Sequence, residues 1–154
     1  MNAKVFHPFV SKYMIKYMYD TSGFKDPLKY RSVLRNEMIK NSGLRGIVEN
    51  HHIIPKQWRN HNTLKKLNFD VNSSYNIVIL PNLKYHFCAS KLEAVHMLIH
   101  SNGHKNYNRY VGVQLDELID KCSEDEDKLK YNFWLFYIYL KDSIDNNSSS
   151  IPWN

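Results

Sequence analysis

A pair of adjacent histidines, followed by two aliphatic residues and a proline, constrains this chain more than any other feature. The run is His51-His52-Ile53-Ile54-Pro55. Neighbouring side chains on a β-strand point to opposite faces. His51 and His52 therefore cannot act from the same side unless the strand twists or ends there. Pro55 provides such an end, because proline donates no hydrogen bond to a strand ladder. The pattern predicts a short strand region over residues 45–55.

Two further features lie downstream of this pair. The run Tyr75-Asn76-Ile77-Val78-Ile79-Leu80-Pro81 is typical of a second short strand, with Asn76 near its start. Two short strands close in sequence predict an antiparallel pair. Farther on, His100 and His104 enclose Ser-Asn-Gly, so they straddle the start of a helix rather than share one helical face. The order along the chain is His-His, then Asn, then His-x3-His.

The rest of the chain is mostly helical by its apolar spacing. We expect amphipathic helices over residues 5–20, 26–40, 85–99 and 104–122, with a short helix in 57–67. The apolar stripe of the 104–122 helix is Tyr107, Val111, Leu115, Leu118 and Cys122. In the second of these, Asp26-Pro27 reads as the N-terminal cap and first turn, with Val33, Leu34 and Met38 facing inward. Ser123-x-x-Glu126 is a capping box that starts a last helix with Leu129, Phe133 and Leu140 inward. The fold class is therefore α+β, mostly helical.

Composition bounds the class of protein only loosely. The 154 residues and 43% apolar content suit one compact domain. The net charge of +6 is mild support for a polyanionic partner. Two cysteines, Cys88 and Cys122, do not form a disulfide framework. Without a secretory signal pattern or a membrane-spanning run, an intracellular, cytoplasmic protein with no membrane partner is expected.

The histidines form a set that can carry metal chemistry. Neutral imidazole is a good ligand for transition metals. His100 and His104 can converge on one ion, and His51 can be the third ligand. Three protein ligands leave a position open, as catalytic sites do. His52 is then free to act as a general base on water, and Asn76 can hold the histidine-bearing loop through its amide.

Four runs together resemble a known family: His51–Pro55, Leu67–Asn72, Asn76–Pro81 and His100–Val111. They look like the AHH family, which belongs to the HNH/endonuclease VII superfamily of ββα-metal (His-Me finger) nucleases. The resemblance covers roughly Val48 to Leu118. One departure is Asn50, which stands before the histidine pair where the family name refers to alanine; that position is not a proposed ligand.

This resemblance implies a β-hairpin plus helix that holds one divalent ion, magnesium, manganese, zinc or nickel, against the scissile phosphate. By likeness, His51, His100 and His104 bind metal, His52 activates water and Asn76 orients the loop that carries this base. His96 is an alternative ligand. Lys105 and Arg109 are candidates for phosphate contact, and their alternative is a solvated helix face. Lys56 and Arg59 add basic charge beside the first histidines.

The implied organisation is one compact unit with four parts. A helical scaffold (1–44) precedes the nuclease core (45–122), a packing helix (123–145) and a flexible tail (146–154).

The expected activity is endonucleolytic hydrolysis of DNA rather than RNA with low sequence specificity, in a toxin-like, mobile-element or viral enzyme. Such an enzyme could be delivered to a target cell or act in an infected host cell, and an inhibitory or immunity protein is a candidate partner. The alternatives are a nucleic-acid-binding module with a structural histidine zinc site, and an interaction protein with a decayed finger.

Overall fold

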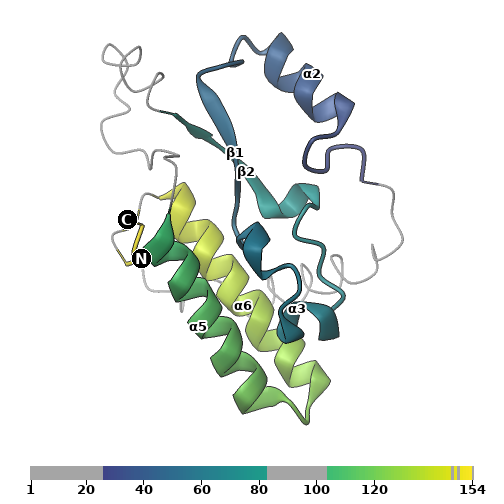
Figure 1. Cartoon of the computed structure of the whole chain (residues 1–154), viewed down its shortest axis with the longest axis vertical. Coiled ribbons are helices and arrows are strands. Elements are labelled where there is room, and N and C mark those ends of the chain that lie inside the picture. The colour runs from purple at the N-terminus through teal and green to yellow at the C-terminus, as the bar shows by residue number, and fades with distance from the viewer. Residues whose placement is uncertain (1–25, 83–103, 147, 149, 154) are drawn as a thin grey trace.

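The computed structural model describes residues 26–82, 104–146, 148 and 150–153. Two antiparallel strands, β1 (Val48–His52) and β2 (Ile77–Pro81), lie between a short helix at one end and a pair of long helices at the other (Figure 1). In the register of the strands, His51 lies opposite Val78 and His52 opposite Ile77. The mostly helical α+β fold and the antiparallel pair are as the sequence predicts. The helices expected over 5–20 and 85–99 lie outside the described residues.

The two strands are joined by a long connection rather than a tight turn. It contains the 3-10 turns η2 (Lys56–Trp58) and η3 (Ser74–Asn76) and the helix α3 (Asn62–Lys66). The single helix expected in 57–67 is interrupted because His61 caps α3, its Nδ1 accepting from the Thr63 N–H at 3.2 Å. The other ring nitrogen of His61, Nε2, lies 2.8 Å from Asp116 on α5. The connection is thereby tied to the long helices.

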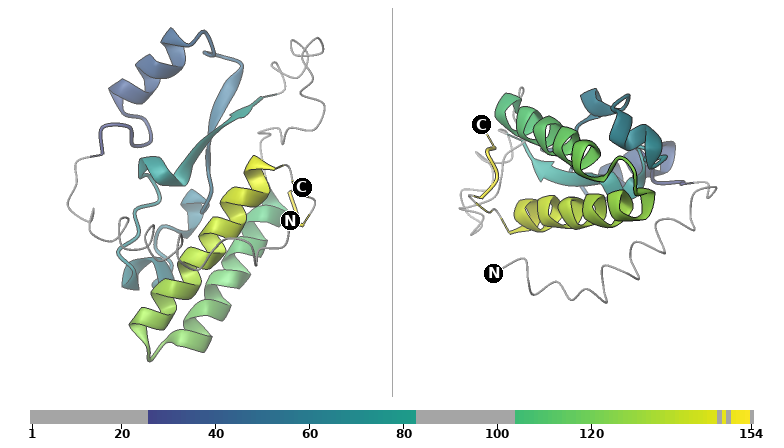
Figure 2. Two further views of the ribbon diagram at one scale, coloured as in Figure 1. Left: turned by 180° about the vertical axis from the view of Figure 1, so that it is seen from behind. Right: turned by 90° about the horizontal axis from the view of Figure 1, so that it is seen from below.

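Helices α5 (Lys105–Cys122) and α6 (Glu126–Asp145) run side by side (Figure 2). The apolar stripes read from the sequence are their buried faces, and they pack against Ile53, Ile54 and Leu64. The fully or nearly fully buried members of the stripes are Tyr107, Val111, Leu115, Cys122, Leu129, Phe133 and Leu140. Among the described helices, none is long and apolar enough to span a membrane.

The start of α6 differs from the expected capping box. Asp125 is the N-cap, and its carboxylate accepts from the Lys128 N–H at 2.9 Å. Ser123 instead closes α5 with helical backbone angles, φ −58° and ψ −29°. An N-cap residue needs extended backbone angles. The helical conformation of Ser123 therefore leaves the capping role to Asp125, two residues later.

The helix before the hairpin is also shorter than expected and turned differently. Helix α2 (Val33–Asn41) begins after the N-cap Ser32, whereas Asp26 closes a turn by accepting from the Leu28 N–H. The prediction that Val33, Leu34 and Met38 face inward is wrong, because they are 73%, 49% and 41% exposed. The buried side chain of α2 is Arg35, so a polar contact rather than an apolar stripe sets the orientation of this helix.

Gly112 on α5 provides a test of how the connection packs on the long helices. A Cβ at this position would lie 2.3 Å from Cζ2 of Trp58. Alanine favours a helix by about 1 kcal/mol over glycine, but overpacking costs about 1–3 kcal/mol. We expect Gly112→Ala to lower the free energy of unfolding in urea. In a Trp58→Ala background it should be neutral or stabilising; equal losses in both backgrounds would contradict the steric explanation.

Tyr137 on α6 links this helix to the residue before Asn76. Its hydroxyl donates to the Tyr75 carbonyl, and burial raises the pKa of Tyr137. A raised folded-state pKa leaves stability intact below the unfolded value of about 10 and removes it as the pH rises above that value. We expect Tyr137→Phe to cost about 1 kcal/mol near neutral pH and to flatten the alkaline loss of stability.

The measurement is urea unfolding of wild type and variant at several pH values on both sides of the unfolded tyrosine pKa. Tyr131→Phe is the matched control, because Tyr131 lies on the same helix and is 42% exposed. Parallel pH profiles for wild type and Tyr137→Phe would show that Tyr137 does not carry the alkaline effect.

Candidate active site

The histidine-bearing end of β1 is held by the buried amide of Asn76. Its Oδ1 accepts from the Ile54 N–H at 2.8 Å, and its Nδ2 donates to the carbonyls of Ile54 at 3.0 Å and Val71 at 2.8 Å. The Asn76 carbonyl also accepts from the Ile53 N–H at 2.8 Å. These bonds fix the backbone that follows His52. Asn76 lies where the sequence reasoning expects a residue that holds this loop.

His51 lies on the buried side of β1, beside His104. The two ring centroids are 5.4 Å apart and the ring planes are nearly perpendicular, at 88°. His104 directly precedes α5, and both side chains are buried, with exposed fractions of 4% and 7%. Tyr107 supports this side by donating its hydroxyl to the Ile53 carbonyl at 2.6 Å. Burial raises the pKa of Tyr107, which keeps that hydroxyl protonated as a donor.

The spacing of these two imidazoles suits a shared ion. Two imidazoles bound to one tetrahedral ion at about 2.1 Å have centroids about 5 Å apart, close to the observed 5.4 Å. Within residues 26–82 and 104–153 as described, no group of three His, Cys, Asp or Glu side chains forms a metal site. The predicted ligand His100 and its alternative His96 lie outside the described residues. The structure thus brings together two of the three expected ligands.

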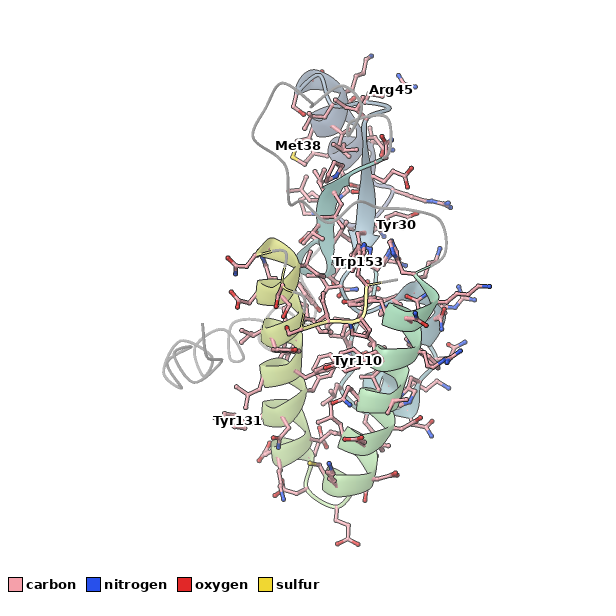
Figure 3. All side chains as sticks on the ribbon, turned by 90° about the vertical axis from the view of Figure 1, so that its left-hand side faces the viewer. Tyr30, Met38, Arg45, Tyr110, Tyr131 and Trp153 are labelled. Atoms are coloured by element: carbon pink, nitrogen blue, oxygen red, sulfur yellow. The ribbon has the colours of Figure 1, made fainter. Side chains whose placement is uncertain are left out.

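Trp153 lies against this pair and was not expected there. Its ring centroid is 4.3 Å from that of His104, 4.9 Å from that of His51 and 5.3 Å from that of Tyr107. Ile151 is buried in the core and Trp153 packs against it, so part of the expected flexible tail is held against the molecule. Figure 3 places Trp153 where the strands approach the long helices. The sequence did contain a signal for this contact: Ile151 and Trp153 are apolar and follow the polar run 146–150.

His52 lies on the other face of β1, as strand alternation predicts. Its Nε2 is 3.2 Å from Oδ1 of Asn72. The ring of Tyr30 meets it edge-on, with centroids 4.5 Å apart and planes at 67°. The side chain is partly exposed, whereas that of His51 is buried. The structure therefore places His51 in a buried environment and His52 in an accessible one.

The predicted basic residues are distributed unevenly around these histidines. Lys56 lies on the side of His52, with its Nζ 5.4 Å from the centroid of the Tyr30 ring. Arg31 reaches the same ring at 5.2 Å, and sequence reasoning did not single it out. The side chains of Arg59, Lys105 and Arg109 are exposed, the last two near the start of α5.

The residue before the histidine pair has a defined partner. Arg35 Nη1 donates to Oδ1 of Asn50 at 3.0 Å, and Arg35 Nε donates to the Leu28 carbonyl at 2.7 Å. Burial lowers the pKa of the Arg35 guanidinium, and nearby Asp26 opposes that shift. Asn50 is thus a docking point between β1 and α2. Not every basic residue lies near the histidines. Figure 3 shows Arg45 at the α2 end of the molecule, away from Tyr30 and Trp153.

Trp153 provides a spectroscopic test of the histidine pair. Because its ring contacts both imidazoles, we expect added Zn²⁺ or Ni²⁺ to change tryptophan emission in wild type and much less in Trp153→Phe.

Loss of an outer-shell partner costs about 10–100-fold in metal affinity, so His51→Ala and His104→Ala should each lower the affinity for the metal by at least that factor, measured by calorimetry. His61→Ala, which alters a helix cap, is the control. Wild-type affinity in both histidine variants would exclude the pair as ligands.

Comparison with known proteins provides the family. The sequence model of AHH, a nuclease family of the HNH/ENDO VII superfamily with a conserved AHH motif, matches residues 34–133. No curated protein and no solved structure matches the chain. The matched range contains β1, β2, α5 and all of the histidines discussed above. The chain belongs to the AHH family of nucleases.

Proposed function

We propose that this nuclease is a metal-dependent endonuclease that hydrolyses phosphodiester bonds of DNA, in preference to RNA, with low sequence specificity. The observation that carries the proposal is the arrangement at the end of β1. His51 is buried beside His104 on one face, and His52 is accessible on the other. Family membership supports nucleic acid as the substrate class.

His51 and His104 are the proposed ligands of one divalent ion, with His100 as the third and His96 as its alternative. Imidazole ligands suit zinc and nickel better than magnesium, and manganese remains a candidate. When bound, a divalent ion would supply Lewis-acid stabilisation of charge on the phosphate and on the leaving oxygen. The spacing of the His51 and His104 rings supports this assignment, because centroids 5.4 Å apart suit two ligands of one ion.

His52 is the proposed general base, which takes a proton from the attacking water. Because His51 and His52 point to opposite faces, we place the scissile phosphate at the end of β1, along its outer edge, where an ion held by His51 and the base His52 would both reach it. In the described part of the chain the sheet has two strands, so this edge carries no third strand. Asn76 keeps the end of β1 in place by binding the backbone of Ile54.

Basic residues around this edge are proposed to bind the phosphate backbone. Lys56 lies near His52, and Arg59, Lys105 and Arg109 are exposed. The N-terminus of α5, beside His104, also favours an anion. Backbone contacts of this kind position the nucleic acid without reading bases. They support low sequence specificity.

The biological setting follows from the activity proposed. A nuclease of low specificity endangers the cell that makes it, so we propose a toxin-like, mobile-element or viral role. Such an enzyme would be delivered to a target cell or would act in an infected host cell. An inhibitory or immunity protein is the corresponding partner.

Cleavage of plasmid DNA and of a structured RNA tests the proposal. We expect DNA cleavage that requires added Mg²⁺, Mn²⁺, Zn²⁺ or Ni²⁺ and stops with chelator. A general base contributes about 10²–10⁴-fold, so His52→Ala should lose at least about a hundredfold in rate while still binding metal. His61→Ala, which alters a histidine that caps α3, should retain activity.

The same experiment separates the rival function. Absence of cleavage of both nucleic acids, with stoichiometric zinc and unfolding on chelation, would replace the nuclease with a binding module built on a structural zinc site. Wild-type cleavage by His52→Ala would keep the nuclease and remove His52 from the role of general base. Faster cleavage of RNA than of DNA would reverse the proposed preference.

A further inference from the structure

An asparagine in the loop before η3 lies against the accessible side of β1 and was not among the predicted site residues. Asn72 places its side-chain carbonyl oxygen 3.2 Å from Nε2 of His52. A carbonyl oxygen only accepts hydrogen bonds. For this contact to be a hydrogen bond, Nε2 of His52 must carry the hydrogen. In the neutral imidazole, that leaves the lone pair on Nδ1.

We propose that Asn72 is the positioning residue of the nuclease. It holds the His52 ring in the tautomer and orientation that present Nδ1 to the attacking water. The catalytic consequence rests on the proposed role of His52 as the general base. Asn72 itself does not touch substrate in this proposal, because it acts through the imidazole. A base oriented by a third group is a recurring arrangement in nucleophilic and acid–base sites.

The backbone of Asn72 is fixed from two sides, which an orienting residue requires. Its N–H donates to Oδ1 of Asp70 at 2.8 Å, and its carbonyl accepts from the Tyr30 N–H at 2.8 Å. The neighbouring Ser73 hydroxyl donates to the Asp70 carbonyl at 2.5 Å. The loop that bears Asn72 leads directly into η3 and Asn76. The same short segment therefore holds both the backbone after His52 and the His52 ring.

Tyr30 completes this arrangement from the other side of the imidazole. Its ring edge contacts His52, and its backbone N–H is the donor to Asn72. Rotation of the His52 ring away from Asn72 would therefore disturb the contact with Tyr30. Lys56 and Arg31 lie over the Tyr30 ring, which places positive charge close to the base, where a phosphate would bind. The orienting contacts and the basic charge thus occur together on one face.

The test compares acceptor-free and acceptor-retaining substitutions at position 72. Asn72→Leu is close to isosteric without an acceptor, Asn72→Ala removes the group, and Asn72→Asp retains an oxygen. Outer-shell partners of metal-ligating histidines are worth about 10–100-fold, and a partner that orients a general base is expected to matter to a similar degree. We expect Asn72→Leu and Asn72→Ala to lose about that factor in kcat on plasmid DNA with saturating metal. KM and metal affinity should stay within about twofold, and Asn72→Asp should recover most of the rate.

A second readout does not depend on cleavage. Nitrogen-15 shifts of the His52 ring at about pH 8, where a typical histidine is neutral, report which nitrogen carries the hydrogen. We expect Nε2–H in wild type and Asn72→Asp, and a mixture of tautomers in Asn72→Leu and Asn72→Ala. Asn82→Ala is the matched control. It removes an asparagine bond to the Gly46 carbonyl at the other end of the hairpin, and it should change neither kcat nor the His52 shifts.

Each outcome bears on the proposal. Wild-type kcat in a folded Asn72→Leu or Asn72→Ala variant, or an unchanged His52 tautomer in either, would overturn it. Loss of rate in Asn72→Asp equal to that in Asn72→Ala would also overturn it, because the acceptor would then be irrelevant. If wild type cleaves no nucleic acid, the proposed function fails, and the nitrogen-15 shifts still decide whether Asn72 sets the tautomer of His52.

Discussion

The structure depends on one buried amide. Asn76 binds both the N–H and the carbonyl of Ile54, as a residue on a partner strand would. The strand ladder ends two residues earlier at His52, and Pro55 follows with no N–H to donate. The side-chain amide therefore substitutes for strand pairing at the position where regular pairing stops. Its third bond, to the Val71 carbonyl, anchors the loop that carries Asn72. An apolar residue at position 76 would leave these buried backbone groups unsatisfied.

This clamp allows adjacent histidines to have different environments. His51 is buried among His104, Tyr107 and Trp153, and this enclosed aromatic setting suits its proposed role as a metal ligand. His52 remains partly exposed and hydrogen-bonded, as proton transfer with water requires. Strand alternation points the two side chains to opposite faces, and the clamp holds the strand end in that conformation. A pair spaced by two residues would put both imidazoles on one face, so adjacency in the sequence is what separates the proposed metal ligand from the proposed general base.

The sequence predicted the parts of this site that follow from local rules. Alternation placed His51 and His52, and the helical stripe placed Tyr107 and its partners. Asn72 and Trp153 could not be placed this way, because their contacts join segments that are distant in the chain. The prediction of which face of α2 points inward was wrong for a related reason. Apolar residues usually face the core, but here the hydrogen bond from Arg35 to Asn50 turns Val33 and Leu34 outward.

The contacts of Asn50 explain why this residue can stand where the family motif has alanine. Residue 50 shares the face of His52, not that of His51, because positions two apart on a strand point the same way. Replacement of alanine by Asn50 therefore leaves the buried ligand side unchanged. On the other face, the amide provides an acceptor for Arg35, whose guanidinium is buried and requires one. In this chain the substitution leaves the proposed ligands unaltered, and Asn50 instead helps to dock the preceding helix on the hairpin.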